Sequence, residues 1–375
     1  MKIILAFDSF KGSLTAQEVT ETVSKVISCK IPDCDLIEIP ISDGGEGFTS
    51  ILARHFHAER ISCSVHNPLG NLIHASYTIT SEGTAIMEMA EASGLSLIPA
   101  VQRNPLNTSS YGVGDMMKDA LAHHCKKIIL GIGGSATNDG GMGMLSALGF
   151  RFYDKNGKLL DSTGKNLQYV ESIDTSSALN LSDVELMVAS DVQNPLFGVD
   201  GAAYIFAPQK GATPEDVAML DQGLQNYAKI MNKTFGKQYA FDAGAGAAGG
   251  LGFALMHLGA TLLSGAELVL RSCQFDELLR HADLVLTGEG KMDKQTLMGK
   301  APASVLHHAQ QAHVPVIGIT GIAEDAGSLK QAGFQDILQI TPPDCDLEEA
   351  LKPGIAKENI RKTVSTLCSK ITTNF

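Results

Sequence analysis

The chain has 375 residues, of which 19% are charged and 44% hydrophobic, and its formal net charge at pH 7 is -12. This length exceeds what one hydrophobic core usually supports, so we expect two domains, and the composition is that of an ordered protein. The negative charge argues against nucleic acid and anionic membranes as partners, because a polyanion attracts an acidic protein only through a dense basic patch, and the sequence contains none.

The start of the chain and its cysteines indicate a cytoplasmic protein. The apolar run before Asp8 is too short for the core of a signal peptide, and no stretch reaches the length of a membrane span. The seven cysteines are scattered and form no Cys-x-x-Cys pair. This pattern is typical of reduced thiols and argues against a structural zinc site.

The first sixty residues alternate between strand and helix patterns. An apolar run at 3–7 predicts a strand, and Thr15 and Glu18 have the spacing of a capping box at the start of a helix. A second strand is expected at 36–39 and a helix after Gly47, and this alternation predicts a parallel sheet. The apolar face of the first helix would consist of Val19, Val23, Val26 and Ile27.

Antiparallel pairing is expected after residue 66, where two strand patterns flank a short turn. In the glycine-rich middle of the chain, strand and helix patterns alternate less regularly, and from residue 282 the plain alternation returns. The expected strands lie at 72–80, 84–89, 127–130, 185–189, 284–287, 314–320 and 337–340, and the clearest helices at 110–123 and 214–231.

We therefore predict an α/β protein with a discontinuous domain. Residues 1–65 and 283–375 would form one doubly wound domain, and residues 66–282 would form a second α/β domain inserted into it. In such sheets, ligands bind beyond the carboxyl ends of the strands. Polar segments that directly follow predicted strands are therefore the candidate site.

The first such segment contains Asp8 and Lys11. Lys11 and the amides of the following helix could hold an anion, while Asp8 could hold a cation. The alternative, that Asp8 and its polar neighbours only cap the helix, is equally supported by this segment alone.

The second segment combines two carboxylates with three glycines, which allow the backbone to approach a ligand closely. An ordinary turn could use the same residues, but it requires neither three glycines nor Glu46. The pattern favours a metal-plus-phosphate or hydroxyl site. Its members are Ser42, Asp43, Gly44, Gly45 and Glu46, followed by Gly47.

The third segment, at 131–141, has five glycines in eleven residues between a predicted strand and a helix. Close packing of the helix on the sheet could explain one or two of these glycines but not all of them. The pattern predicts a phosphate-binding loop. The residues expected to bind phosphate or Mg²⁺ are Gly133, Gly134, Ser135, Thr137, Asn138 and Asp139.

The fourth segment follows the strand at 284–287 and could by itself be a loop of mixed composition. It contains carboxylates and lysines in the same topological position as the other segments, and Asp191 adds a carboxylate after the strand at 185–189. Its candidate ligands for the cofactor or the reacting group are Gly288, Glu289, Gly290, Asp293 and Lys300.

Other familiar patterns are weak or absent. Residues 244–249 match the dinucleotide pattern G-x-G-x-x-G, but 237–243 is a poor candidate for a buried strand, so a closely packed helix start is favoured. The chain has no P-loop and no protein-kinase motif. Its paired histidines lack the spacing of a zinc site.

Taken in order, the motifs closely resemble those of the bacterial type I glycerate kinases over essentially the whole length. Departures are small, such as Ala207 and Ala303, and remove no plausible ligand. The shared segments are AFDSFKGSLTA, ISDGGEGF, GIGGSATNDGGMGML, SDVQNPLFGVDGAA, APQKGA, GAGAAGGLG and LVLTGEGKMDKQTLMGKAP.

The resemblance implies a flavodoxin-like domain formed by both chain ends, an inserted α/β domain, and an active site in the cleft between them. It also implies ATP and Mg²⁺ as cofactors and phosphorylation of D-glycerate, with 2-phosphoglycerate as the expected product, in the catabolism of organic acids. The runner-up reading is an NAD(P)-dependent oxidoreductase based on 244–249. A non-catalytic regulator that senses a phosphorylated small molecule is the second alternative.

Phosphoryl transfer needs cations on the phosphates, amide donors on the oxygens and a carboxylate that accepts the hydroxyl proton. Lys11 and Lys300 are the cationic candidates, and Asp191 is the candidate base. Asp43 and Asp293 are the candidate metal ligands. The substrate-binding candidates are Asp8, Lys11, Ser42, Asp43, Gly44, Gly45 and Glu46.

Overall fold

The computed structural model describes residues 1–41 and 48–374. The chain divides into two compact units, unit 1 formed by residues 1–43 and 264–375, and unit 2 formed by residues 44–263. Within the described residues, no helix is both long enough and apolar enough to cross a lipid bilayer.

Unit 1 is built around a parallel five-stranded sheet with the order β15-β13-β11-β1-β2. Counted along this unit, the order is 2-1-3-4-5, the flavodoxin-like doubly wound arrangement that the resemblance implied. The strands are β1 (Lys2–Phe7), β2 (Asp35–Glu38), β11 (Leu284–Gly288), β13 (Val316–Thr320) and β15 (Asp336–Gln339), with the short parallel pair β12 (Lys291–Met292) and β14 (Ile322–Ala323) beside them.

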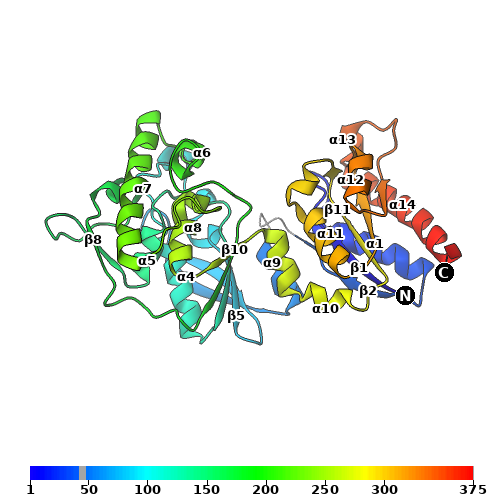
Figure 1. Cartoon of the computed structure of the whole chain (residues 1–375), viewed down its shortest axis with the longest axis horizontal. Coiled ribbons are helices and arrows are strands. Elements are labelled where there is room, and N and C mark those ends of the chain that lie inside the picture. Colours follow the sequence, from blue (N-terminus) through cyan, green and yellow to red (C-terminus); the bar gives the residue numbers. More distant parts are fainter. Residues whose placement is uncertain (42–47, 375) are drawn as a thin grey trace. The chain divides into compact units, whose positions relative to one another are not determined.

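Helices cover both faces of this sheet. Helices α1 and α14 contact each other (Figure 1) and share one hydrophobic cluster with Ile3, Leu5 and Phe7 of β1. Ile4 and Ala6, which face the other side, are also fully buried, and α11 contacts β1, β11 and β13. The helices are α1 (Ala16–Lys30), α9 (Gly265–Ser272), α10 (Phe275–Leu279), α11 (Ala301–Gln311), α12 (Ala326–Ala332), α13 (Leu347–Ala350) and α14 (Pro353–Asn374).

The start of α1 confirms the predicted capping box. The backbone N–H of Glu18 donates to Thr15 Oγ1 at 3.2 Å, and the backbone N–H of Thr15 donates to the Glu18 carboxylate at 3.1 Å. The predicted apolar face is also confirmed, because Val19, Val23 and Ile27 are buried in the unit 1 core and Val26 packs against it. Local sequence therefore determines both the start and the orientation of this helix.

Unit 2 contains a mixed six-stranded sheet with the order β10-β9-β6-β5-β4-β3. The strands from β10 to β5 are parallel, whereas β5, β4 and β3 pair antiparallel, as the turn pattern after residue 66 predicted. The strands are β3 (Glu59–His66), β4 (Leu72–Ile79), β5 (Thr84–Glu88), β6 (Lys127–Gly131), β9 (Glu185–Ala189) and β10 (Thr261–Leu263), and β7 (Arg151–Tyr153) pairs separately with β8 (Ser172–Asp174).

One large hydrophobic cluster joins the helices of unit 2 to this sheet. The helix expected at 214–231 is confirmed as α7 to within a few residues, and in the structure a capping box at Thr213 begins it and Gly236 ends it. The α-helices are α2 (Phe48–His55), α3 (Ala90–Ser93), α4 (Tyr111–Ala122), α5 (Met142–Ala147), α6 (Ala202–Phe206), α7 (Pro214–Phe235) and α8 (Ala247–His257).

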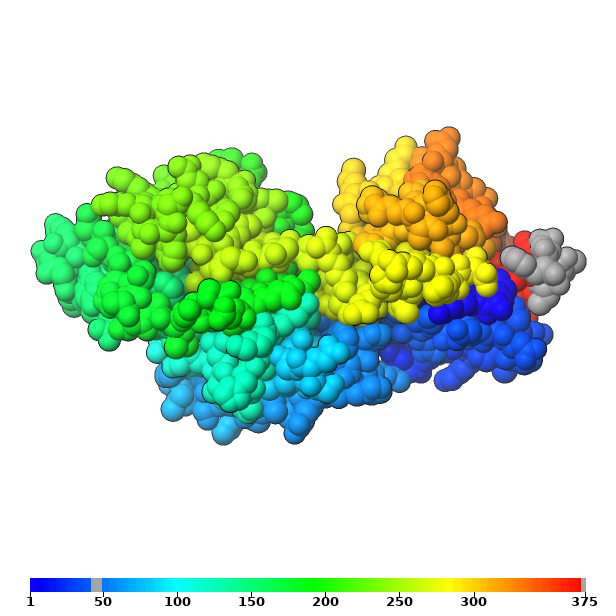
Figure 2. Space-filling model, turned by 60° about the horizontal axis from the view of Figure 1, so that its bottom comes forward, coloured from blue at the N-terminus to red at the C-terminus, as the bar shows by residue number. Residues whose placement is uncertain are grey.

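The boundaries of the compact units differ from the predicted ones at both ends of the insert. Strand β3, assigned to the N-terminal domain by the sequence, pairs with β4 along its whole length and so belongs to unit 2. Residues 264–282, assigned to the insert, form α9 and α10, which contact α11 of unit 1. Figure 2 shows the blue N-terminal residues of unit 1 lying against yellow residues from the later part of the chain.

Candidate functional site

In unit 1, two sequence-predicted segments meet at the carboxyl ends of β1 and β11. Phe7 is in register with Gly288, and the Asp8 N–H donates to the Gly288 carbonyl at 2.9 Å. Thr287 on β11 donates its hydroxyl to the Ala6 carbonyl at 2.6 Å. The parallel pairing therefore places Asp8 and the segment after Gly288 side by side, where ligands bind in open α/β sheets.

Two glycines allow this close approach. A Cβ atom at Gly288 would collide with the carbonyl oxygen of Ile319 on β13, so any larger residue would push the strands apart. A Cβ atom at Gly290 would lie 3.2 Å from the backbone nitrogen of Lys11. The glycines thus let the loop after β11 pack on the loop after β1. Lys11 in the loop after β1 is exposed.

Glu289 is the centre of a hydrogen-bonded group. Its side chain is 11% exposed and accepts from Thr296 Oγ1 at 2.7 Å and from Lys300 Nζ at 3.1 Å. Its backbone carbonyl accepts from Thr320 Oγ1 at 2.8 Å. Because both carboxylate oxygens are occupied by protein donors, Glu289 holds Lys300 in place.

Asp293 joins the same group through Thr296. Its backbone N–H donates to Thr296 Oγ1 at 3.0 Å, and its carboxylate accepts from the Gln295 N–H at 2.8 Å. Lys291 Nζ lies 3.7 Å from the other carboxylate oxygen. The fold therefore brings together three of the predicted residues of the fourth segment, Glu289, Asp293 and Lys300.

The second predicted segment, with Ser42, Asp43, Gly44, Gly45 and Glu46, lies outside the described residues. In the part of the chain that the structure describes, no group of three or more His, Cys, Asp and Glu side chains is arranged to hold a metal ion. A metal at Asp293 would thus need ligands from outside this set, such as phosphate oxygens.

In unit 2, the glycine-rich loop leaves the carboxyl end of β6. Gly133 and Gly134 are exposed and Ser135 is half-buried. Two backbone hydrogen bonds join the loop to residues 93–95: the Leu95 N–H donates to the Gly134 carbonyl, and the Ala136 N–H donates to the Ser93 carbonyl, both at 2.9 Å. These first residues of the loop are accessible to a ligand.

The rest of the loop lies inside unit 2, and its role as a nucleotide ligand stays a prediction. Thr137, Asn138 and Asp139 are fully buried in unit 2. The Asp139 carboxylate accepts from the backbone and hydroxyl of Ser110 at 2.7 and 2.8 Å, and from the amides of Gly141 in its own loop and Gly143 in α5, both at 3.1 Å. Burial raises the pKa of Asp139, and these hydrogen bonds oppose the rise. Asp139 therefore stabilises the loop from inside.

Lys210, in the segment APQKGA, is a further polar residue at this loop. Lys210 is only 2% exposed and donates from Nζ to Ser135 Oγ at 2.6 Å and to the Thr137 carbonyl at 2.7 Å. Burial lowers the pKa of Lys210 to about 7, and the negative charge of Asp139 opposes this change. A lysine is rarely buried so completely, and no local pattern in the sequence indicates that this one is.

Asp191 lies two residues beyond the end of β9, the strand that pairs with β6. Gly131 and Ala189 are in register, so the residue after Ser190 and the glycine-rich loop leave the same edge of the unit 2 sheet. Asp191 is exposed. Within unit 2 the structure thus brings together Asp191 and the start of the loop at Gly133.

The G-x-G-x-x-G match at 244–249 forms the tightly packed start of α8. A Cβ atom at Gly249 would collide with the Thr137 carbonyl, and one at Gly246 with the Pro195 carbonyl. Residues 237–243 form no strand. The segment therefore lacks the strand that a dinucleotide site requires, and the predicted packing role of its glycines is confirmed.

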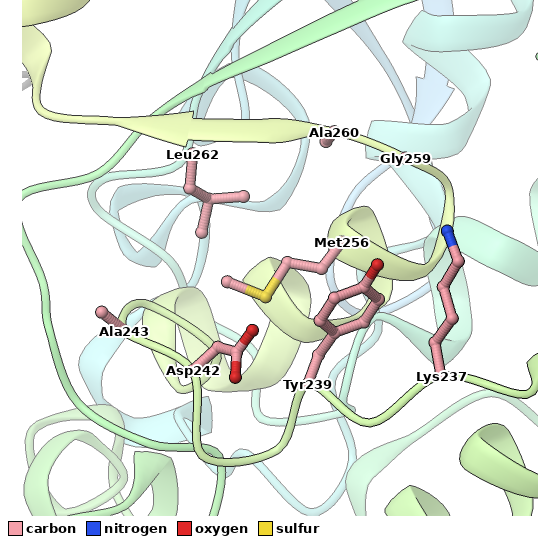
Figure 3. A pocket seen from close by; sticks show the side chains of 8 residues that line it. All are labelled: Lys237, Tyr239, Asp242, Ala243, Met256, Gly259, Ala260 and Leu262. Atoms are coloured by element: carbon pink, nitrogen blue, oxygen red, sulfur yellow. The ribbon is translucent and has the colours of Figure 1, made fainter.

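A pocket of about 650 Å³ lies in unit 2 next to β10. Figure 3 shows Met256 and Leu262 on its apolar side, with Tyr239, Asp242 and Lys237 along its other wall. None of the sequence-predicted site residues lines it. This pocket is therefore distinct from the loop edge that carries Asp191 and Ser135.

Comparisons with known proteins agree with the motifs. A sequence model described as "Glycerate kinase family" matches residues 3–372. The chain is 41% identical to a Bacillus subtilis (strain 168) protein named "Glycerate kinase", covering 99% of this chain and 98% of that protein. It is 42% identical to an Escherichia coli (strain K12) protein named "Glycerate 2-kinase", covering 97% and 98%.

Among solved structures, the chain is similar to a crystal structure of a candidate glycerate kinase 2 from Salmonella typhimurium LT2. The TM-score is 0.87 at 40% sequence identity, and the match covers 100% of this chain and 99% of the other. The likeness therefore extends over both units and over every segment considered above.

Proposed function

This chain belongs to the glycerate kinase family, and we propose that it transfers the γ-phosphoryl group of Mg-ATP to the 2-hydroxyl of D-glycerate. The observation that carries the proposal is the group formed by Glu289, Asp293 and Lys300 at the carboxyl edge of the unit 1 sheet. A fixed cation beside a partly exposed carboxylate is what phosphoryl transfer needs, because the reaction is mainly positioning and charge stabilisation.

In this proposal Lys300, held by Glu289, offsets negative charge on the transferring phosphoryl group. Lys11, exposed in the neighbouring loop, attracts an anionic group of a substrate, and Asp8 begins the same loop. Asp293, with Asp43, would hold Mg²⁺, which proteins usually bind through one or two carboxylates plus substrate phosphates. When bound, the metal ion neutralises phosphate charge.

In unit 2, we assign Asp191 as the base that accepts the proton of the substrate hydroxyl. Its exposed position just beyond the carboxyl end of β9 supports this role. The amides of the exposed residues Gly133 and Gly134 and the hydroxyl of Ser135 are proposed to bind anionic oxygens. The reaction would belong to the cytoplasmic breakdown of glycerate and related organic acids.

The test is to incubate the purified protein with Mg-ATP and D-glycerate and to identify the product by phosphorus NMR. We expect ADP and 2-phosphoglycerate in equal amounts. A 3-phosphoglycerate signal would contradict the choice of hydroxyl, and absence of any phosphorylated product would contradict the activity itself. Titration with NADH in place of ATP tests the oxidoreductase alternative, for which we expect no binding.

A further inference from the structure

The buried lysine of unit 2 contacts the accessible part of the glycine-rich loop. Lys210 ends the short 3-10 helix Pro208–Lys210, and its Nζ lies 2.6 Å from Ser135 Oγ. Ser135 follows the exposed Gly133 and Gly134 and is itself half-buried. One end of this contact is thus inside the unit, and the other is at the surface where the loop leaves β6.

The charges around Lys210 keep its side chain in this place. A second hydrogen bond to the Thr137 carbonyl at 2.7 Å fixes the amine from the other side. The carboxylate of Asp139 attracts the positive charge, although burial lowers the pKa of Lys210 to about 7. Moving a lysine amine out of water is unfavourable, so packing alone does not explain why a lysine occupies this buried position.

The contact determines where the Ser135 hydrogen points. In its charged form, which the Asp139 carboxylate favours, the Lys210 amine can only donate hydrogen bonds, so Ser135 Oγ is then the acceptor. The hydroxyl hydrogen is then directed away from Lys210, and within the described residues it has no acceptor in hydrogen-bonding range. A half-buried hydroxyl fixed in this way is a preorganised donor for a group outside the protein.

We propose that Lys210 is a positioning residue that fixes the Ser135 hydroxyl as a hydrogen-bond donor to an anionic oxygen of a substrate. This inference rests on the proposed function, which supplies two such oxygens, those of the nucleotide phosphates and those of the glycerate carboxylate. Gly133 and Gly134 place bare backbone amides next to the hydroxyl, as an anion site requires. Lys210 itself does not touch the substrate.

The experiment measures the binding of two probes separately by calorimetry, a non-hydrolysable Mg-ATP analogue and D-glycerate. We expect Ser135→Ala to weaken one of them about 10- to 100-fold, the usual effect of losing a hydrogen bond to a charged group. Ser135→Thr, which keeps a hydroxyl, should restore most of that binding. Whichever probe responds identifies the anion that Ser135 contacts.

A double-mutant cycle separates positioning from a general structural effect. Lys210→Met should weaken the same probe, and adding it to Ser135→Ala should cause no further loss, because it acts through the serine. If Lys210→Met does not fold because Asp139 is left uncompensated, the same cycle is measured with Asp139→Asn as the parent. Ser93→Ala is the matched control, since the Ser93 hydroxyl is fully buried and has no partner among the described residues.

Additive effects in the cycle, or unchanged binding of both probes to Ser135→Ala, would overturn the inference. In either case the wild-type protein would still bind both probes and turn over, so the proposed function would stand. Failure of the wild-type protein to bind either probe would overturn the proposed function and this inference with it.

Discussion

The pair formed by Lys300 and Glu289 shows how single residues are prepared for chemistry. Lys300 is 42% exposed, so an ion pair there adds little to the free energy of unfolding. Its value is geometric, since Glu289 is nearly buried and is itself held by Thr296. Lys300 therefore starts the reaction in one position and does not have to be ordered by the substrate.

We predict that Lys300→Met lowers kcat by about 10²-fold or more while the melting temperature changes little, because its charge is needed mainly as negative charge develops. Steady-state kinetics and thermal denaturation measure both quantities. Lys294→Met is the matched control, because Lys294 pairs with Asp325 on the surface. A change confined to the KM for glycerate would instead place Lys300 on the substrate carboxylate.

Asp191→Asn should lower kcat by about 10²- to 10⁴-fold, the usual contribution of a positioned base. Asparagine keeps the size of the side chain, so we expect a melting temperature close to that of the wild type. Asp183→Asn, an exposed aspartate ahead of the same strand, should leave kcat unchanged. A large loss of stability in Asp191→Asn would show that the carboxylate has a structural role.

At the scale of elements, α9 and α10 are joined to α11 by a charged cluster. His308 on α11 is 11% exposed and contacts Glu267 of α9 at 3.0 Å and Asp276 of α10 at 2.6 Å. Arg271 also contacts Glu267, at 2.6 Å, and His307 lies next to His308. The two carboxylates raise the pKa of His308 above its ordinary 6.5, chiefly through the hydrogen bond to Glu267, while the pKa of Glu267 falls to about 2.

The cluster makes the stability of unit 1 depend on pH. The contribution of His308 to the free energy of unfolding is complete below pH 6.5 and is lost as the pH rises through its raised pKa. The contribution of Glu267 is complete above about pH 4.5 and is lost as the pH falls towards its lowered pKa of about 2. We expect His308→Gln to lower the free energy of unfolding by about 1–3 kcal/mol at pH 5.5 and by less at pH 9.

Urea denaturation of the wild type and His308→Gln across this pH range measures the difference. His307→Gln is the control, because His307 is exposed and, within the described residues, its ring forms a hydrogen bond only with Gln311. A stability difference that stays constant between pH 5.5 and pH 9 would show that protonation of His308 does not contribute.

At the scale of the whole molecule, unit 2 has its own sheet and its own hydrophobic core. We predict that residues 44–263 fold alone and unfold cooperatively, because a domain with a complete core usually can. The fragment 66–282 should fold poorly, since it lacks β3, the edge partner of β4, and carries α9 and α10 without α11. Circular dichroism during thermal denaturation compares the two fragments, and equal cooperativity would contradict the boundaries.

The sequence by itself determined the features that depend on near neighbours. The capping box at Thr15, the buried face of α1 and the strand patterns at β1, β11 and β13 are written in residues a few positions apart. The ordered motifs also predicted the family and the flavodoxin-like strand order. The capping and periodicity patterns can be recognised in the sequence because the hydrogen bonds and hydrophobic spacing behind them involve residues only a few positions apart.

Only the tertiary structure decided which distant residues meet and which are hidden. Ser135 and Lys210 are 75 positions apart, and the burial of Lys210 depends on where its short helix packs. The same packing buries Thr137, Asn138 and Asp139, although the loop pattern presented them as ligands. Strand β3 joined unit 2 because its pairing with β4 fixes its place, and strand pairing and burial depend on the whole fold, beyond what any local pattern can record.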